Sequence, residues 1–172
     1  PLYAVVHAGD AARLYASDDA GQRWQERGAI APWPTAPLVG LVAREGEALF
    51  LATAEGLYAS DDAGQTWRRR STWPADAAPL ALYDVADGVF LGQRAEGDLL
   101  RSDDGGQTWQ ATGLRDVGLV AASGPRGYAT WPGGLARSDD AGQTWQAIPA
   151  PPGTPASLAV DPQVADTLYV GL

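Results

Sequence analysis

Residues 60–67 read SDDAGQTW, and the chain of 172 residues contains three near-copies of this stretch. They are SDDAGQRW at residues 17–24, SDDGGQTW at 102–109 and SDDAGQTW at 138–145, so successive copies start 43, 42 and 36 residues apart. A catalytic site rarely occurs in four near-copies, whereas a structural turn of a repeat protein does. A period of this length is typical of a solenoid, an array or a propeller.

Each period also contains signals for short β-strands. Runs rich in Leu, Val, Tyr and Trp are bounded by Gly, Pro and Asp, which is the pattern of strands joined by turns. In the second period these runs are VGLVAR (39–44), ALFLAT (48–53), GLYAS (56–60) and TWRRR (66–70), and the third period repeats them. We find no helical periodicity. Four short antiparallel strands per period predict an all-β propeller with four-stranded blades.

The motif is expected to close the turn between the third and fourth strands of each repeat. Ser60 and Asp62 are residue types that hydrogen-bond backbone amides one turn ahead. Gly64 allows a positive φ, and Trp67 offers a large apolar surface for burial against a neighbouring sheet. A calcium loop would need oxygen ligands at its third and fifth positions, where this motif has Ala and Gln. We therefore predict a structural role, with no metal and no cofactor.

This pattern resembles the Asp-box, S-x-D-x-G-x-T-W, which is the signature of the BNR (bacterial neuraminidase) repeat. The repeat occurs in sialidases, sortilin-like receptors and photosystem II assembly factors of the Ycf48 type. The resemblance implies a β-propeller fold and leaves the function open. Arg23 replaces the Thr of the motif, so the first turn is expected to be looser. The motif falls on Ser17, Asp19, Gly21 and Trp24; Ser60, Asp62, Gly64, Thr66 and Trp67; Ser102, Asp104, Gly106, Thr108 and Trp109; and Ser138, Asp140, Gly142, Thr144 and Trp145.

The two ends of the sequence add incomplete blades to this pattern. In such blades the innermost strand comes first, so residues 1–6 look like a second strand and residues 157–172 like a first and a second strand. We expect one propeller domain over residues 1–172, with three complete blades, a first blade without its inner strand and a final strand pair. The blades form either a small closed ring of about four or an arc of a larger propeller.

Composition restricts the partners. The net charge of −9 opposes binding to nucleic acid or to an anionic membrane, and the absence of cysteine excludes disulfides and thiolate metal sites. No apolar run is long enough to span a membrane. All twelve basic residues are arginine, which suggests a GC-rich source. The chain starts with Pro1 and lacks methionine, so we expect a cleaved form, an expressed fragment or part of something longer.

Candidate partner-binding residues lie in loops that join one blade to the next. Trp33 and Trp73 are each followed by proline, and Arg68, Arg69 and Arg70 run into the second loop. Trp and Arg are common interface hot spots, so these five residues suit an acidic protein or an anionic glycan. The alternatives are that the two rings fill gaps between blades and that the arginines form a solvated edge, with at most two of them on one surface.

Catalytic signals are weak. A sialidase would need converging arginines, a tyrosine nucleophile with a glutamate partner and an aspartate acid, and no carboxylate pair stands out. Tyr15 and Tyr58 precede Asp-boxes and are expected in the core, and His7 has no evident partner. We therefore expect a non-catalytic interaction scaffold, exported and part of a larger assembly. The alternatives are a glycan-binding or sialidase-like hydrolase propeller and an assembly factor for a membrane complex.

Overall fold

The computed structural model describes residues 1–8, 11–30, 37–44, 48–74, 79–161, 163–164 and 166–172. Within these ranges the protein contains seventeen β-strands and no helix, so the described part has no helix that could span a membrane. The described residues form two compact units, Pro1–Trp73 and Pro74–Leu172, and each is described by itself. The all-β prediction is confirmed, and the prediction of a single domain stays a prediction.

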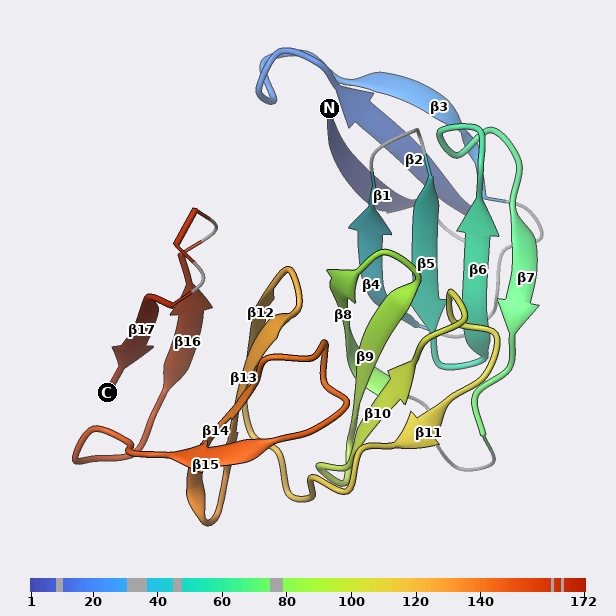
Figure 1. Ribbon diagram of the computed structural model, residues 1–172. Helices are drawn as coiled ribbons and strands as arrows, with labels where there is room; N and C mark the ends of the chain where they lie inside the picture. Colours follow the sequence, from blue (N-terminus) through green and yellow to red (C-terminus); the bar gives the residue numbers. More distant parts are fainter. Residues whose placement is uncertain (9–10, 31–36, 45–47, 75–78, 162, 165) are drawn as a thin grey trace. The chain divides into compact units, whose positions relative to one another are not determined.

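The first unit contains two antiparallel sheets whose strands pair in chain order. One sheet has three strands and the other has four (Figure 1). The three-stranded sheet comprises β1 (Leu2–Ala8), β2 (Ala11–Ser17) and β3 (Gln25–Ala29). The four-stranded sheet comprises β4 (Leu38–Ala43), β5 (Leu49–Thr53), β6 (Gly56–Ser60) and β7 (Arg68–Ser71).

The second unit contains two four-stranded antiparallel sheets and a strand pair. The first sheet comprises β8 (Pro79–Ala86), β9 (Val89–Arg94), β10 (Leu99–Ser102) and β11 (Gln110–Ala111). The second comprises β12 (Val120–Ser123), β13 (Arg126–Trp131), β14 (Gly134–Ser138) and β15 (Gln146–Ile148), and the pair is β16 (Ser157–Val160) with β17 (Leu168–Gly171). The first strands β8, β12 and β16 neighbour one another, as expected if each blade starts with its innermost strand.

These sheets match the predicted blades. Three are complete, the first lacks its inner strand, and the last is a strand pair. Every motif lies between the third and fourth strands of its blade. The outermost strands β11 and β15 are shorter than the sequence suggested, with two and three residues. Their residues are mostly exposed, and a short outer strand limits the unpaired edge that a sheet presents to solvent.

The core of each unit joins residues from consecutive sheets. Strands β5 and β6 are buried at every position, which explains why LFLAT and GLYAS read as continuous apolar runs rather than alternating ones. In the first unit, Leu14 of β2 belongs to the same cluster as Leu49 of β5 and Trp67. In the second unit, Leu91 of β9 clusters with Ala129 of β13. The sheets are therefore held together face to face by apolar packing.

Candidate functional site

The four motif turns share one hydrogen-bond pattern, in which the serine is central. Its Oγ donates to the second motif aspartate at 2.7–2.8 Å and accepts the glycine N–H at 2.8 Å. The four serines are buried, because each lies under its turn. The aspartate in turn accepts the backbone N–H four residues ahead at 2.8–2.9 Å. The motif polar groups are thus used to close the turn, as the sequence predicted.

The threonine of the motif adds a further bond in three of the four turns. The hydroxyls of Thr66, Thr108 and Thr144 donate to the aspartate Oδ2 at 2.6 Å. Arg23 has no hydroxyl, and only its backbone N–H donates to Asp19. The first turn therefore lacks one hydrogen bond that the others make.

These bonds stabilise the charged form of the motif aspartates. Hydrogen bonds from the hydroxyl and amide of Thr66, and then from Ser60, lower the pKa of Asp62 to about 2. Desolvation raises the pKa of Asp104, but the hydrogen bonds donated by Thr108 and Ser102 outweigh it and lower the pKa to about 2. The pKa values of Asp19 and Asp140 are lowered as well. All four carboxyls are thus poor proton donors at neutral pH.

The turn backbone lets the second and fourth motifs approach the preceding sheet of the same unit closely. A Cβ added to Gly64 would lie 2.0 Å from Leu14 Cδ2, and one added to Gly142 would lie 2.6 Å from Leu91 Cδ2. Both glycines have positive φ, at +86° and +80°. Arg101 of β10 also donates from Nε to the carbonyl of Ala141 at 3.0 Å. The motif turn of one repeat therefore covers the sheet of the repeat before it.

A second feature of the turns is an ion pair that the sequence analysis missed. The first aspartate of each motif, which the Asp-box consensus leaves free, pairs with an arginine in all four repeats. The pairs are Asp18 with Arg27, Asp61 with Arg68, Asp103 with Arg101, and Asp139 with Arg137 and Arg126. The signal was present in the sequence: Arg101 and Arg137 precede the motif serine where the first two copies have Ala.

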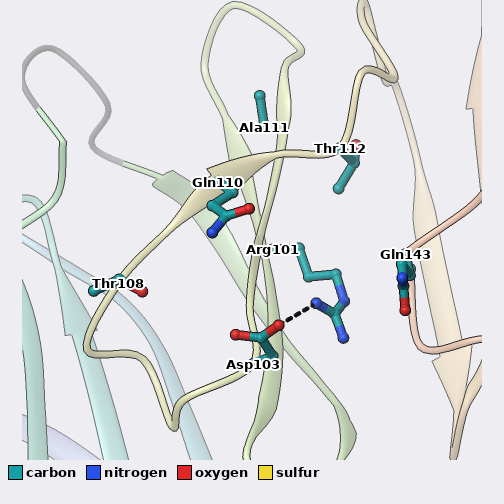
Figure 2. A pocket seen from close by; sticks show the side chains of 8 residues that line it. Arg101, Asp103, Thr108, Gln110, Ala111, Thr112 and Gln143 are labelled. Carbon is teal, nitrogen blue, oxygen red and sulfur yellow. Dashed lines mark hydrogen bonds and ion pairs between the residues drawn. The ribbon is translucent and has the colours of Figure 1, made fainter.

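A shallow polar pocket lies beside two of these turns. In the third repeat, a pocket of about 110 Å³ is lined by Arg101, Asp103, Gln110 and Gln143, among others. Figure 2 shows the Arg101 guanidinium directed at Asp103, with Gln143 across the pocket. In the second repeat, a pocket of about 260 Å³ has the Asp61–Arg68 pair in the corresponding place. Asp61 and Asp103 are each paired with a guanidinium, and Asp62 in the second pocket accepts hydrogen bonds from Ser60 and Thr66, so the described carboxylates of both pockets are already engaged.

The structure separates the residues predicted to bind a partner. Trp33 lies outside the described residues. Trp73 is only 8% exposed, and its indole N–H donates to the carbonyl of Thr53 at 2.7 Å. Its burial favours the gap-filling alternative over partner binding.

The three arginines predicted to bind a partner do not all contact the same part of the blade. Arg68 pairs with Asp61 of the motif turn, whereas Arg69 donates to the carbonyl of Glu55 in the β5–β6 turn. Arg70 also makes an interaction within the protein. The two turns lie at opposite ends of β6, so neighbouring arginines on β7 serve different ends of the blade.

One tyrosine differs from its expected place. Tyr58 is buried, as predicted, but Tyr15 is only half-buried, and its hydroxyl lies 3.5 Å from Glu26 Oε2 across β2 and β3. Arg13 pairs with the other oxygen of Glu26. Among the described residues, no three His, Asp or Glu side chains are grouped so that they could hold a metal ion.

Comparison with known families agrees with the turn geometry. The model of the BNR/Asp-box repeat matches residues 100–111 and 136–147, which contain the third and fourth turns. The third and fourth turns therefore match the BNR/Asp-box repeat model. The search of curated proteins found no match.

Solved structures with a similar fold include GH74 enzymes and YCF48. YCF48 bound to D1 peptide matches with a TM-score of 0.65 and 18% identity, covering 92% of this chain and 53% of that one. The GH74 xyloglucanase from Xanthomonas campestris matches with a TM-score of 0.63 and 19% identity, covering 95% and 34%. An ancestral GH74 enzyme gives 0.63 and 16%, covering 97% and 27%. The chain thus spans about a quarter to a half of these proteins, and the likeness shows the propeller fold.

Proposed function

We propose that the chain is a non-catalytic interaction scaffold. The observation that supports this proposal is the use of its carboxylates. Among the described residues, the four carboxyls with a clearly shifted pKa are motif aspartates, and in each the pKa is lowered. A general acid for glycoside hydrolysis needs a raised pKa at neutral pH. The chemistry of the turns therefore favours structural carboxylates.

The partner that we propose is a protein segment, within an exported or cell-surface assembly. YCF48, a propeller of similar fold, has been solved with a D1 peptide, so a fold of this kind accommodates a peptide partner. A non-photosynthetic source would exclude the photosystem version of the assembly-factor alternative. Trp33 remains the proposed aromatic contact, while the burial of Trp73 makes it a structural residue.

The test compares partner capture by the parent chain and by two variants. Trp33→Ala should reduce the protein captured from native extract at least tenfold while leaving the melting temperature within about 2 °C. Trp73→Ala should lower the melting temperature, because it empties a buried site and leaves the Thr53 carbonyl unpaired. Equal capture by the parent and Trp33→Ala would remove Trp33 from the proposed interface.

A second candidate function is a sialidase-like hydrolase, and one contact favours it. The Tyr15 hydroxyl next to Glu26 has the residue types of a tyrosine nucleophile with its carboxylate base. The pair also has a structural explanation, because Arg13 already neutralises Glu26 and the residues face each other across two strands.

A fluorogenic sialoside and xyloglucan separate the two functions. The scaffold proposal expects no turnover above the buffer rate with either substrate. Turnover that persists through purification and is lost in Tyr15→Phe would establish the hydrolase and overturn the scaffold.

A further inference from the structure

The fourth blade has a sheet face that no motif turn covers in the described part of the chain. A groove of about 480 Å³ lies between this sheet and the β16–β17 pair. Its lining includes Tyr128, Leu135, Arg137, Ile148, Leu168 and Val170. Asp166 also lines the groove, so its wall combines apolar side chains with one arginine and one aspartate.

The residues of this groove occupy the register positions that a motif turn covers in the third blade. Leu91 pairs with Arg101 across β9 and β10, and Tyr128 pairs with Arg137 across β13 and β14. In the third blade, Leu91 contacts Gly142 of the next turn, and Arg101 donates to the next turn as well. The wall of the groove thus corresponds to the surface of the third blade that the fourth motif turn covers.

Arg101 and Arg137 differ in hydrogen bonding and exposure, as expected if a motif turn covers the first and none covers the second. Arg101 Nε donates to the Ala141 carbonyl of the following turn, and the side chain is 18% exposed. Arg137 Nε is buried and has no hydrogen-bond partner among the described residues, while the side chain is 37% exposed. A buried N–H without an acceptor is destabilising, so this atom is suited to a carbonyl from outside.

The strand next to the groove also has an unused edge. β17 pairs only with β16 among the described strands, whereas the second strand of each complete blade has a partner on both sides. An unpaired edge accepts an additional strand through main-chain hydrogen bonds. The position beside β17 is that of the third strand, which carries the motif turn in the other blades.

We propose that this groove is a docking surface for a β-hairpin that carries an Asp-box, bound as the third and fourth strands of the β16–β17 blade. The hairpin pairs with β17, its Trp and Gly pack on Tyr128 and Leu135, and the carbonyl before the Gly accepts the Arg137 Nε–H. The sequence of the first motif is a suitable probe hairpin for the test, because its Ala20 and Trp24 are exposed, whereas Ala141 of the fourth turn is buried. The inference does not depend on the scaffold function proposed above.

The test adds such a hairpin to the full chain. Residues 168–172 read LYVGL and residues 2–6 read LYAVV, so a second copy of residues 7–30 appended after Leu172 continues the strand in register. The extended chain should melt at least 4 °C above the parent. Hydrogen exchange at the outward amides of Leu168–Gly171 should slow at least tenfold, because a third strand now accepts them.

Two matched controls isolate the groove. An extension in which the counterparts of Gly21 and Trp24 are changed to Val and Asp should give neither effect. Ile148→Arg in the extended chain should abolish both effects, and in the parent chain it should leave the exchange of β17 unchanged. If the unmodified extension changes neither melting nor exchange, the proposal is overturned. It is also overturned if the parent already forms dimers that Ile148→Arg dissociates, because the occupant would then be a second copy of this chain.

Discussion

At the scale of single residues, the motif serine and aspartate form the hydrogen bonds that close a turn. The serine is buried and both donates and accepts, while the aspartate accepts from as many as four groups, as Asp104 does. The turn hydrogen bonds explain their spacing, since the serine bonds two and four residues ahead and the aspartate four residues ahead.

The lowered pKa values of these aspartates predict acid sensitivity. A carboxyl whose folded pKa lies below its unfolded value of about 3.9 stabilises the fold above that value. The contribution is lost as the pH falls toward the folded pKa, which is about 2 for Asp62 and Asp104. We therefore expect the melting temperature to fall between pH 4 and pH 2. The double variant Asp62→Asn, Asp104→Asn should show a smaller fall over this range in calorimetry. Parallel curves for the parent and the variant would contradict this role.

At the scale of elements, the packing of a turn on the preceding sheet is the contact that joins consecutive blades. Gly142 and Gly113 allow this contact to be measured, since both have φ near +80° but only Gly142 lies against a neighbour. Gly113→Ala should cost about 1–2 kcal/mol from backbone strain alone. Gly142→Ala should cost about 1–3 kcal/mol more in urea unfolding, because its methyl group would overlap Leu91.

Leu91→Ala supplies the control for this comparison. The leucine truncation should destabilise the parent but recover part of the loss in the Gly142→Ala background, because it removes the overlapping atoms. Equal losses for Gly142→Ala and Gly113→Ala would mean that the turn does not press on β9.

Strand positions were largely predictable at this scale. The second period was expected at residues 39–44, 48–53, 56–60 and 66–70, and its strands are Leu38–Ala43, Leu49–Thr53, Gly56–Ser60 and Arg68–Ser71. Short runs of strand-forming residues, bounded by turn residues, indicate the strand positions within each local segment of sequence. The burial of Trp73 was not predictable in the same way, because its acceptor, the Thr53 carbonyl, lies twenty residues earlier in a different strand.

At the scale of the whole chain, one motif residue changes its environment from repeat to repeat. Trp67 and Trp109 are each 8% exposed, whereas Trp24 is 44% exposed. In the described part of the chain, no sheet precedes β1–β3 to cover the first ring. The burial expected of Trp67 is thus also found at Trp109, whereas Trp145 is partly buried and Trp24 is exposed.

This difference predicts a graded response to truncation. Trp67→Ala and Trp109→Ala should each cost about 3–5 kcal/mol of unfolding free energy, because each empties a buried site. Trp24→Ala should cost about 1 kcal/mol or less, as for an exposed side chain. Denaturant unfolding of the three variants measures the effect, and equal losses would show that the burial of these rings does not set their contribution to stability.

The ion pair beside each turn has a consequence for how such repeats diverge. In the third repeat the arginine, Arg101, lies on the strand before the turn, and the second repeat has Ala59 at that position. In the second repeat the arginine, Arg68, lies on the strand after the turn, and the third repeat has Gln110 there. The residue type at each of these two positions varies between repeats, yet every repeat has an arginine that pairs with the first motif aspartate. Substitutions at the two places are therefore expected to accumulate jointly during evolution. A comparison of repeats that scores these two positions together would therefore detect relationships that a comparison of single positions misses.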